Sequence, residues 1–108
     1  MRRLTLSAAL LLATASLAQA RPATCLVQIN GLTVIDGPCD FDPFNGDGSF
    51  YVTTLDGGYF AEVRMLKKGL AEGRWNEIRW SDLPRVYLGT LGRRDACWVN
   101  SYATICAW

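Results

Sequence analysis

The side chains that most often carry out catalysis are scarce in this sequence. Histidine, the commonest general base, is absent, and the serines lie in no recognisable nucleophile motif. The sequence also lacks a phosphate-binding loop and a dinucleotide-binding fingerprint. Its ten acidic residues would allow a carboxylate pair of the kind that hydrolyses glycosidic bonds, although spacing along the chain does not identify one. We therefore expect a protein that binds a target rather than an enzyme, without a cofactor.

The four cysteines are the most informative reactive residues. Four thiolates can bind zinc, but the absence of a CxxC motif and of histidine favours two disulfides. Three connectivities are possible, and we expect Cys25–Cys39 and Cys97–Cys106. The first closes a loop of 15 residues, for which chain entropy predicts roughly 3 kcal/mol of stabilisation.

The second disulfide follows from a predicted hairpin near the end of the sequence. A two-residue turn at 101–102 places Cys97 opposite Cys106 at a non-hydrogen-bonded position. The Cα atoms of facing residues there lie about 4.5 Å apart, which is within disulfide range. Trp98 and Trp108 flank this disulfide, and we expect both to pack against it.

Two features supply candidate binding residues. Lys67 and Lys68 precede Gly69, a pattern typical of a loop tip. Adjacent cations at such a tip are usually only solvated, but they could instead reach into an acidic cleft. Tyr102, at the tip of the predicted hairpin, is the aromatic residue that we most expect to be exposed. An exposed aromatic ring can stack on a sugar or anchor a protein interface.

The segment Asp40–Gly48 is rich in the oxygen ligands that calcium prefers. It fails the EF-hand template, because the twelfth position counted from Asp40 is Tyr51, where the template requires a bidentate glutamate. A looser calcium loop remains open, although Asn-Gly and Asp-Gly pairs are also turn formers. We expect a loop here between the first hairpin and the next strand, and we assign it no metal.

The first 20 residues have the pattern of a cleavable secretory signal peptide. Arg2 and Arg3 form a positive n-region, residues 4–18 are almost wholly apolar, and Ala18-Gln19-Ala20 supplies the cleavage pattern. The apolar run is short for a transmembrane helix, so we expect export to the periplasm or beyond the cell. Disulfides form in oxidising compartments, which agrees with this localisation.

Cleavage would leave residues 21–108 as a single domain of 88 residues. A hydrophobic core of this size is marginal by itself, so disulfides are an expected means of stabilisation. Without Arg2 and Arg3 the domain has nine cations and ten acids, a net charge of −1. This balance is unlike that of a nucleic-acid-binding protein.

Short β-type runs separated by turn residues fill the predicted domain. Asn30-Gly31, between the first two runs, is a strong hairpin signal. No window shows a sustained helical period, and residues 67–73, with two glycines, favour a loop. The pattern predicts an all-β fold, a small antiparallel β-sandwich or barrel of about eight short strands. The predicted strands are residues 25–29, 32–35, 49–54, 59–66, 74–80, 86–91, 96–100 and 103–107.

The sequence resembles a known group of proteins in three stretches, Leu32–Cys39, Gly89–Asn100 and Ile105–Ala107. It resembles small exported two-disulfide proteins of alphaproteobacteria, a resemblance that implies no activity. In plan, such a domain is also similar to the periplasmic inhibitors of c-type lysozyme, which insert a serine and a lysine into an acidic catalytic cleft. Their Ser-Gly-x-x-Tyr signature is absent here, so no inhibitory residue is carried over.

Three functions fit these observations. The first is a non-enzymatic binding module that interacts with or inhibits a cell-wall hydrolase such as lysozyme, with a cationic loop facing catalytic carboxylates. The second is a carbohydrate- or peptidoglycan-binding module that uses exposed aromatic side chains. The third is a small carboxylate-dependent glycoside hydrolase. The expected partners therefore belong to the cell envelope, and neither nucleic acid nor stable membrane insertion is expected.

Overall fold

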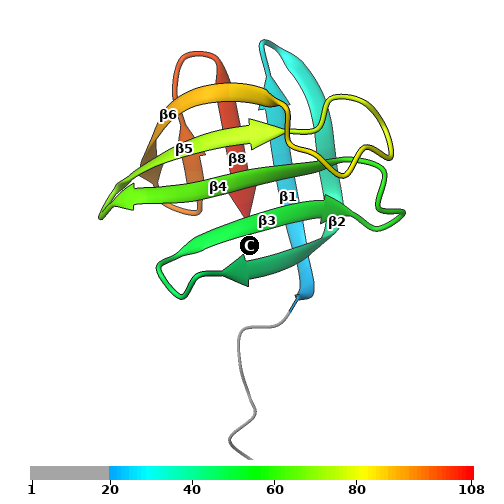
Figure 1. Ribbon diagram of the computed structural model, residues 1–108, viewed down its shortest axis with the longest axis horizontal. Helices are drawn as coiled ribbons and strands as arrows, with labels where there is room; N and C mark the ends of the chain where they lie inside the picture. The colour runs from blue at the N-terminus through cyan, green and yellow to red at the C-terminus, as the bar shows by residue number, and fades with distance from the viewer. Residues whose placement is uncertain (1–19) are drawn as a thin grey trace, which may run out of the picture.

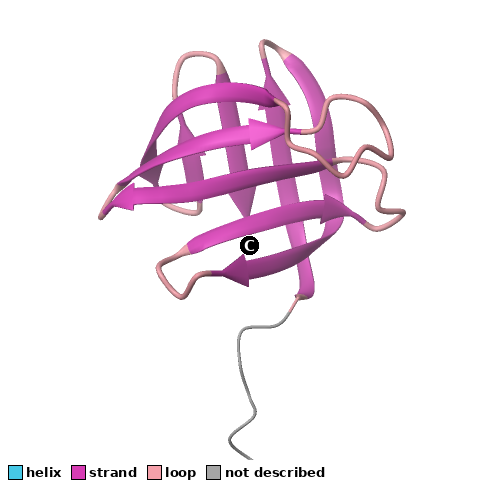
Figure 2. Ribbon diagram, viewed as in Figure 1, coloured by secondary structure: helices cyan, strands magenta, loops and turns pink. Residues whose placement is uncertain are grey.

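The computed structural model describes residues 20–108, so the predicted signal peptide, apart from Ala20, lies outside the described residues. Residues 21–107 form eight antiparallel strands that close into a barrel (Figures 1 and 2). Within the described range no helix is long and apolar enough to cross a membrane. The strands are β1 (Arg21–Ile29), β2 (Leu32–Phe44), β3 (Ser49–Thr54), β4 (Phe60–Lys67), β5 (Leu70–Trp75), β6 (Val86–Arg94), β7 (Cys97–Val99) and β8 (Ala103–Ala107).

Each strand pairs with the next along the chain, and β1 pairs with β8 to complete the circle. In this last pairing Val27 faces Ile105, and the backbones of Thr24 and Trp108 exchange hydrogen bonds of 3.3 and 2.9 Å beyond it. The sequence left a sandwich and a barrel open, and the structure is the barrel. Closure pairs the outer edges of β1 and β8, which would otherwise be exposed.

Because consecutive strands run in opposite directions, the connections between them lie alternately at one end of the barrel and at the other. One end, called here the mouth, carries Arg21, the turns at 45–48, 68–69 and 95–96, and Trp108. The opposite end, called the far end, carries the connections at 30–31, 55–59, 76–85 and 100–102. Any two residues placed at the same end can therefore contribute to one site, however far apart they are in the sequence.

The middle of the barrel is filled by branched aliphatic side chains. Val27, Val52, Val63, Leu91 and Ile105 are all completely buried there. Gly73 also faces the interior, where a Cβ atom would lie only 2.8 Å from Leu91 Cδ1. Glycine therefore stands in the middle of β5 because no side chain fits beside Leu91.

Both predicted disulfides are present. Cys25–Cys39 joins β1 to β2 with a Cα–Cα distance of 5.9 Å, and Cys97–Cys106 joins β7 to β8 with a distance of 4.0 Å. The predicted register of the last hairpin is confirmed, because Cys97 faces Cys106 and Trp98 faces Ile105. Trp98 is buried as expected, but Trp108 is 58% exposed, so the prediction that it packs against the disulfide was wrong.

β2 is much longer than the sequence suggested. The predicted strand ended at Ile35 and the predicted loop began at Asp40, but β2 continues to Phe44 and only residues 45–48 turn. Gly37, with a φ of +130°, lies within the part of β2 that pairs with β1, two residues before the pairing with β3 begins at Cys39. Ile35 faces β1, whereas Phe44 faces Ser49 in β3. Glycine in a strand commonly marks such a bend in a barrel.

The predictions for residues 67–80 were also wrong in part. β5 occupies residues that were predicted as a loop. Of the two glycines there, Gly69 (φ +78°) lies in the turn, whereas Gly73 lies within the strand. Conversely, the strand predicted to reach Trp80 ends at Trp75. Glu77 and Trp80 have φ values of +51° and +72°, which are incompatible with an extended strand. The other predicted strands match the observed ones to within a few residues, and β3 and β8 match them fully.

Candidate functional site

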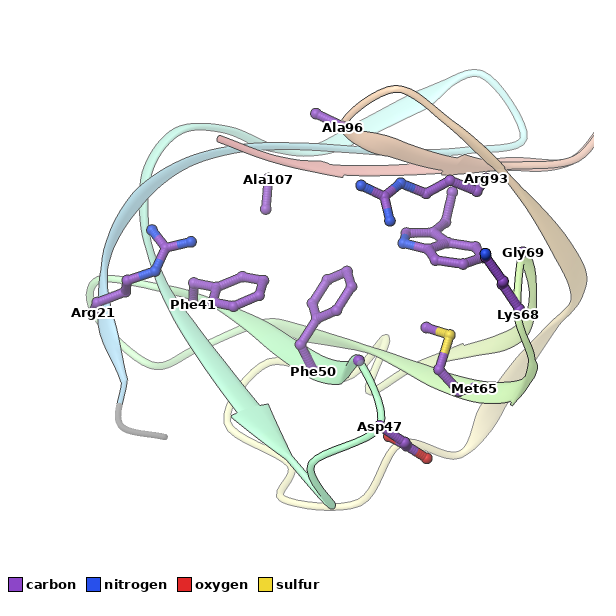
Figure 3. A pocket seen from close by; sticks show the side chains of 12 residues that line it. Arg21, Phe41, Asp47, Phe50, Met65, Lys68, Gly69, Arg93, Ala96 and Ala107 are labelled. Carbon is purple, nitrogen blue, oxygen red and sulfur yellow. The ribbon is translucent and has the colours of Figure 1, made fainter. Parts of the chain in front are cut away.

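A pocket of about 420 Å³ opens into the barrel at the mouth. We call it the mouth pocket. Its walls include the apolar side chains of Phe41, Phe50, Met65 and Trp98, from four different strands. Figure 3 shows Phe41, Phe50 and Met65 projecting into it. Its rim carries four charged residues, Arg21, Asp47, Lys68 and Arg93.

The mouth pocket exists because the barrel interior is filled unevenly. Phe41 and Phe50 pack against each other across β2 and β3, with ring centroids 4.8 Å apart. The small side chain of Ala107 points into the pocket from the opposite side, and Gly48, Gly69 and Ala96 also line it. An eight-stranded barrel is just wide enough for its own side chains or for one small ligand. At this end the side chains do not fill the available space.

Three cations reach the rim from three separate parts of the chain. Arg21 is the first residue of β1, Lys68 lies in the turn between β4 and β5, and Arg93 lies near the end of β6. Arg21 lies on one side of the pocket and the other two cations on the opposite side (Figure 3). Among the described residues none of these cations forms an ion pair. The ion pairs there are Arg64–Glu62, Arg74–Glu72 and Arg79–Asp56.

The two rim arginines lie over apolar walls. The guanidinium carbon of Arg21 is 4.6 Å from the ring centroid of Phe41, and that of Arg93 is 5.5 Å from the ring of Trp98. These are cation–π distances, and each ring helps to hold the charge at the rim. Arg93 Nε also donates a hydrogen bond of 2.6 Å to the carbonyl of Asp95, which leaves the end of the guanidinium directed to other partners.

Asp47 is the one acid that lines the mouth pocket. Its carboxylate points away from the pocket in Figure 3, and its Oδ1 accepts a hydrogen bond of 2.9 Å from the N–H of Ser49. Hydrogen bonds from Ser49, through its hydroxyl first and its backbone N–H second, lower the pKa of Asp47 from its ordinary value of 3.8. Asp47 is therefore ionised at neutral pH, and the rim still carries an excess of two positive charges.

The structure separates the binding residues that the sequence suggested. Lys68 lies on the rim, and Lys67 lines a second hollow of about 350 Å³, which shares Asp47, Met65 and Lys68 with the mouth pocket. Tyr102 is 46% exposed, as expected, but it lies at the far end of the barrel. The two lysines and the tyrosine therefore cannot contribute to one compact site.

Sequence reasoning missed Arg21 and Arg93. No local motif marks either residue, because their relation to Lys68 depends on the closure of the barrel and on the strand register. The available signal was weak: Arg21 directly follows the predicted cleavage point, and Arg93 belongs to an Arg-Arg-Asp turn sequence. If the up-and-down barrel had been known, all three residues could have been placed at the same end and recognised as neighbours.

The far-end loops are held by two asparagine side chains, the buried Asn76 and the partly buried Asn100. The amide nitrogen of Asn76 donates to the carbonyls of Gly58, Ile78 and Ser81 at 3.0 to 3.1 Å, and its Oδ1 accepts from the N–H of Phe60. Asn100 similarly donates to two carbonyls of β6 and accepts from two N–H groups of its own turn. These hydrogen bonds fix the far-end loops.

The segment considered for calcium contributes no cluster of ligands. Asp40 and Asp42 lie in β2, and Asp47 lies in the turn that follows it. Within residues 20–108 no group of three or more acidic or cysteine side chains is arranged to hold a metal ion. The turn at 45–48 instead has three residues with positive φ, Asn45, Gly46 and Gly48, which is the backbone geometry that these residue types favour.

Comparison with known proteins gives no information on function, so the functional interpretation rests on the geometry of the structure. No family model matches the chain, and neither a curated protein nor a solved structure matches it. Function must therefore be inferred from the mouth pocket, its rim and the far-end loops themselves.

Proposed function

We propose that this protein is a non-enzymatic, exported binding module that inhibits a cell-wall hydrolase such as lysozyme, with the rim of the mouth as its contact surface. The observation that supports this most is the set of three cations around one opening, none of which has an ion-pair partner in the described chain. A glycoside hydrolase presents complementary chemistry, because two catalytic carboxylates face an open substrate cleft. Such complementarity accelerates association and selects the partner.

Lys68 is the residue that we assign to the catalytic carboxylates. Lys68 is exposed in the two-residue turn at the tip of the hairpin formed by β4 and β5. Arg21 and Arg93 lie over the rings of Phe41 and Trp98 and would add to the positive potential of the rim. The two disulfides support the proposed periplasmic or extracellular location, since such bonds persist in oxidising compartments.

The rim favours binding over catalysis. Hydrolysis of a glycosidic bond needs two carboxyl groups roughly 5 to 9.5 Å apart, flanking the scissile bond. Asp47 is the one acid that lines the mouth pocket, and its carboxylate is turned away from it. A peptidoglycan-binding role through aromatic rings has less support. The rings of Trp80, Tyr87 and Tyr102 are exposed at or near the far end, and that of Trp108 is exposed at the mouth. The guanidinium groups of Arg79 and Arg74 already lie over the rings of Trp80 and Tyr87, which leaves less of these rings for stacking on a sugar.

An inhibition assay tests the proposed function directly. We expect the untagged, oxidised domain to slow the lysis of peptidoglycan by a c-type lysozyme and to co-elute with it in size-exclusion chromatography. Lys68→Ala should weaken inhibition by about tenfold or more, which corresponds to about 1.4 kcal/mol.

Arg85→Ala is the matched control. Arg85 is exposed in the far-end loop and forms no ion pair among the described residues, so its replacement removes the same charge from the opposite end. Its inhibition should equal that of the unmodified domain. The proposal is overturned if the unmodified domain inhibits no cell-wall hydrolase of either the lysozyme or the lytic transglycosylase type, or if the two variants lose the same activity.

A further inference from the structure

The mouth pocket has a feature that contact with a hydrolase does not use: it is hollow and lined by aromatic rings. Below the rim, Phe41, Phe50 and Trp98 surround a space of about 420 Å³, and Met65 completes the wall. Volumes of this order are typical of sites for small organic molecules. The branched side chains that fill the middle of the barrel close the bottom of the space, so a ligand would enter from the mouth alone.

The charges of the rim stand directly above this apolar space. Arg21 lies over the ring of Phe41 and Arg93 over the ring of Trp98, on opposite sides of the opening. A molecule whose apolar part occupied the space would therefore hold its other end between two guanidinium groups. Guanidinium groups bind carboxylates in a bidentate manner, and they do so more strongly next to an apolar wall than in open water.

We propose that the mouth pocket binds a small amphiphilic anion, a carboxylate attached to an apolar body about the size of a decyl chain or a naphthalene ring. The carboxylate lies between Arg21 and Arg93, and the apolar body lies among Phe41, Phe50 and Trp98. Ala107, whose methyl group points into the pocket in Figure 3, marks the space that the body occupies. This ligand site goes beyond the proposed function because it requires no protein partner.

Isothermal titration calorimetry of the untagged, oxidised domain tests the ligand site. Decanoate, below its micellar concentration, should bind with a stoichiometry of one. Decan-1-ol, which lacks the charge, should bind at least about tenfold more weakly, and inorganic phosphate, which lacks the apolar body, should give no measurable heat. 2-Naphthoate in parallel distinguishes an aromatic ligand from an acyl ligand, because the better fit should bind more tightly.

Two variants test the two halves of the site separately. Arg93→Gln should weaken decanoate binding by about tenfold and leave that of decan-1-ol unchanged, whereas Arg85→Gln at the far end should change neither. Ala107→Leu should abolish binding of both molecules by filling the space. Thermal unfolding by circular dichroism identifies a variant that fails to fold, and Ala107→Val then provides a second, smaller substitution that fills the pocket from the same wall position.

The ligand site is overturned if neither decanoate nor 2-naphthoate binds at millimolar concentration, or if both pocket-filling variants bind as well as the unmodified domain. Its failure is distinguishable from that of the proposed function. Hydrolase inhibition without carboxylate binding would remove the ligand site alone, and carboxylate binding without inhibition would remove the inhibitor alone. If both hold, decanoate should reduce inhibition, because Arg93 and Lys68 share one rim.

Discussion

The two ends of the barrel are held in different ways. At the far end, the side chains of Asn76 and Asn100 are consumed by hydrogen bonds to loop backbone, and Asp56 is paired with Arg79. At the mouth, a disulfide between Cys97 and Cys106 fixes the last hairpin directly beside the pocket wall. A covalent bond needs no polar side chain to hold the strands together.

This difference explains why the unpaired cations gather at the mouth. A loop that depends on its own polar side chains for structure cannot also offer them to a ligand. Strands held by barrel closure and a disulfide can carry Arg21 and Arg93 without an ion-pair partner for either charge among the described residues. The far-end loops are therefore held by their own polar side chains, whereas the mouth presents the cations to which we assign the proposed binding.

The largest expected effect is the loss of the Asn76 amide. Asn76→Ala should reduce the free energy of unfolding by about 3 kcal/mol, because it removes four hydrogen bonds made by a buried amide and leaves the carbonyl of Ser81 and the N–H of Phe60 without their side-chain partner. Urea denaturation measures the change, and Gln28→Ala, an exposed side chain on β1, should stay within about 0.5 kcal/mol. Decanoate affinity per folded molecule should be unchanged. A loss of affinity with full stability would show that the ends are not independent.

Removing the disulfide at the mouth should have a slightly smaller effect on stability but a clear effect on binding. Cys97→Ser with Cys106→Ser should cost about 2 to 3 kcal/mol and weaken decanoate binding, because Trp98 follows Cys97 directly in β7. The second pair, Cys25→Ser with Cys39→Ser, joins β1 to β2 and lines no part of the mouth pocket, although Cys25 faces Ala107 in β8; it should cost about as much stability and change binding less. Equal losses of affinity in the two double variants would contradict a specific role of the Cys97–Cys106 disulfide in holding the pocket wall.

The smallest expected effect concerns acid sensitivity at the far end. The hydrogen bond from the backbone N–H of Gly58, followed by that from the Thr54 hydroxyl and the charge of Arg79, lowers the pKa of Asp56 from 3.8. A carboxyl whose pKa is lower in the folded state stabilises the fold above its ordinary pKa, and this contribution is lost as pH falls through the lower, folded value. Asp56→Asn should therefore be slightly less stable at pH 7 and show a shallower loss of stability below pH 3.8. If urea denaturation shows that the free energy of unfolding of Asp56→Asn falls at acidic pH as steeply as that of the unmodified domain, Asp56 has no structural role.

Local patterns predicted much of the fold because they act over a few residues. Asn30-Gly31 makes the first hairpin with φ values of +49° and +81°, which is the geometry that such a pair favours. The two disulfides followed from spacing and from the register of one hairpin. The errors arose where a glycine served the barrel interior or a bend instead of a turn, as Gly73 and Gly37 do.

The candidate site could be predicted only in part. Lys68 is visible in the sequence because it shares a turn with Gly69. Its neighbours Arg21 and Arg93 are 47 and 25 positions away, and only closure of the sheet brings them to one rim. The pocket itself depends on which interior positions hold small residues, such as Ala107, and that becomes clear only when the register is known.

The pairing of β1 with β8 has a practical consequence for work on this protein. Thr24 and Trp108 are hydrogen-bonded neighbours, so both ends of the described chain emerge beside the mouth. An affinity tag or fusion partner at either terminus would crowd the rim. A circular permutant, with Trp108 linked to Arg21 and new termini opened at the exposed 30–31 turn, would carry a tag at the far end and leave the rim accessible.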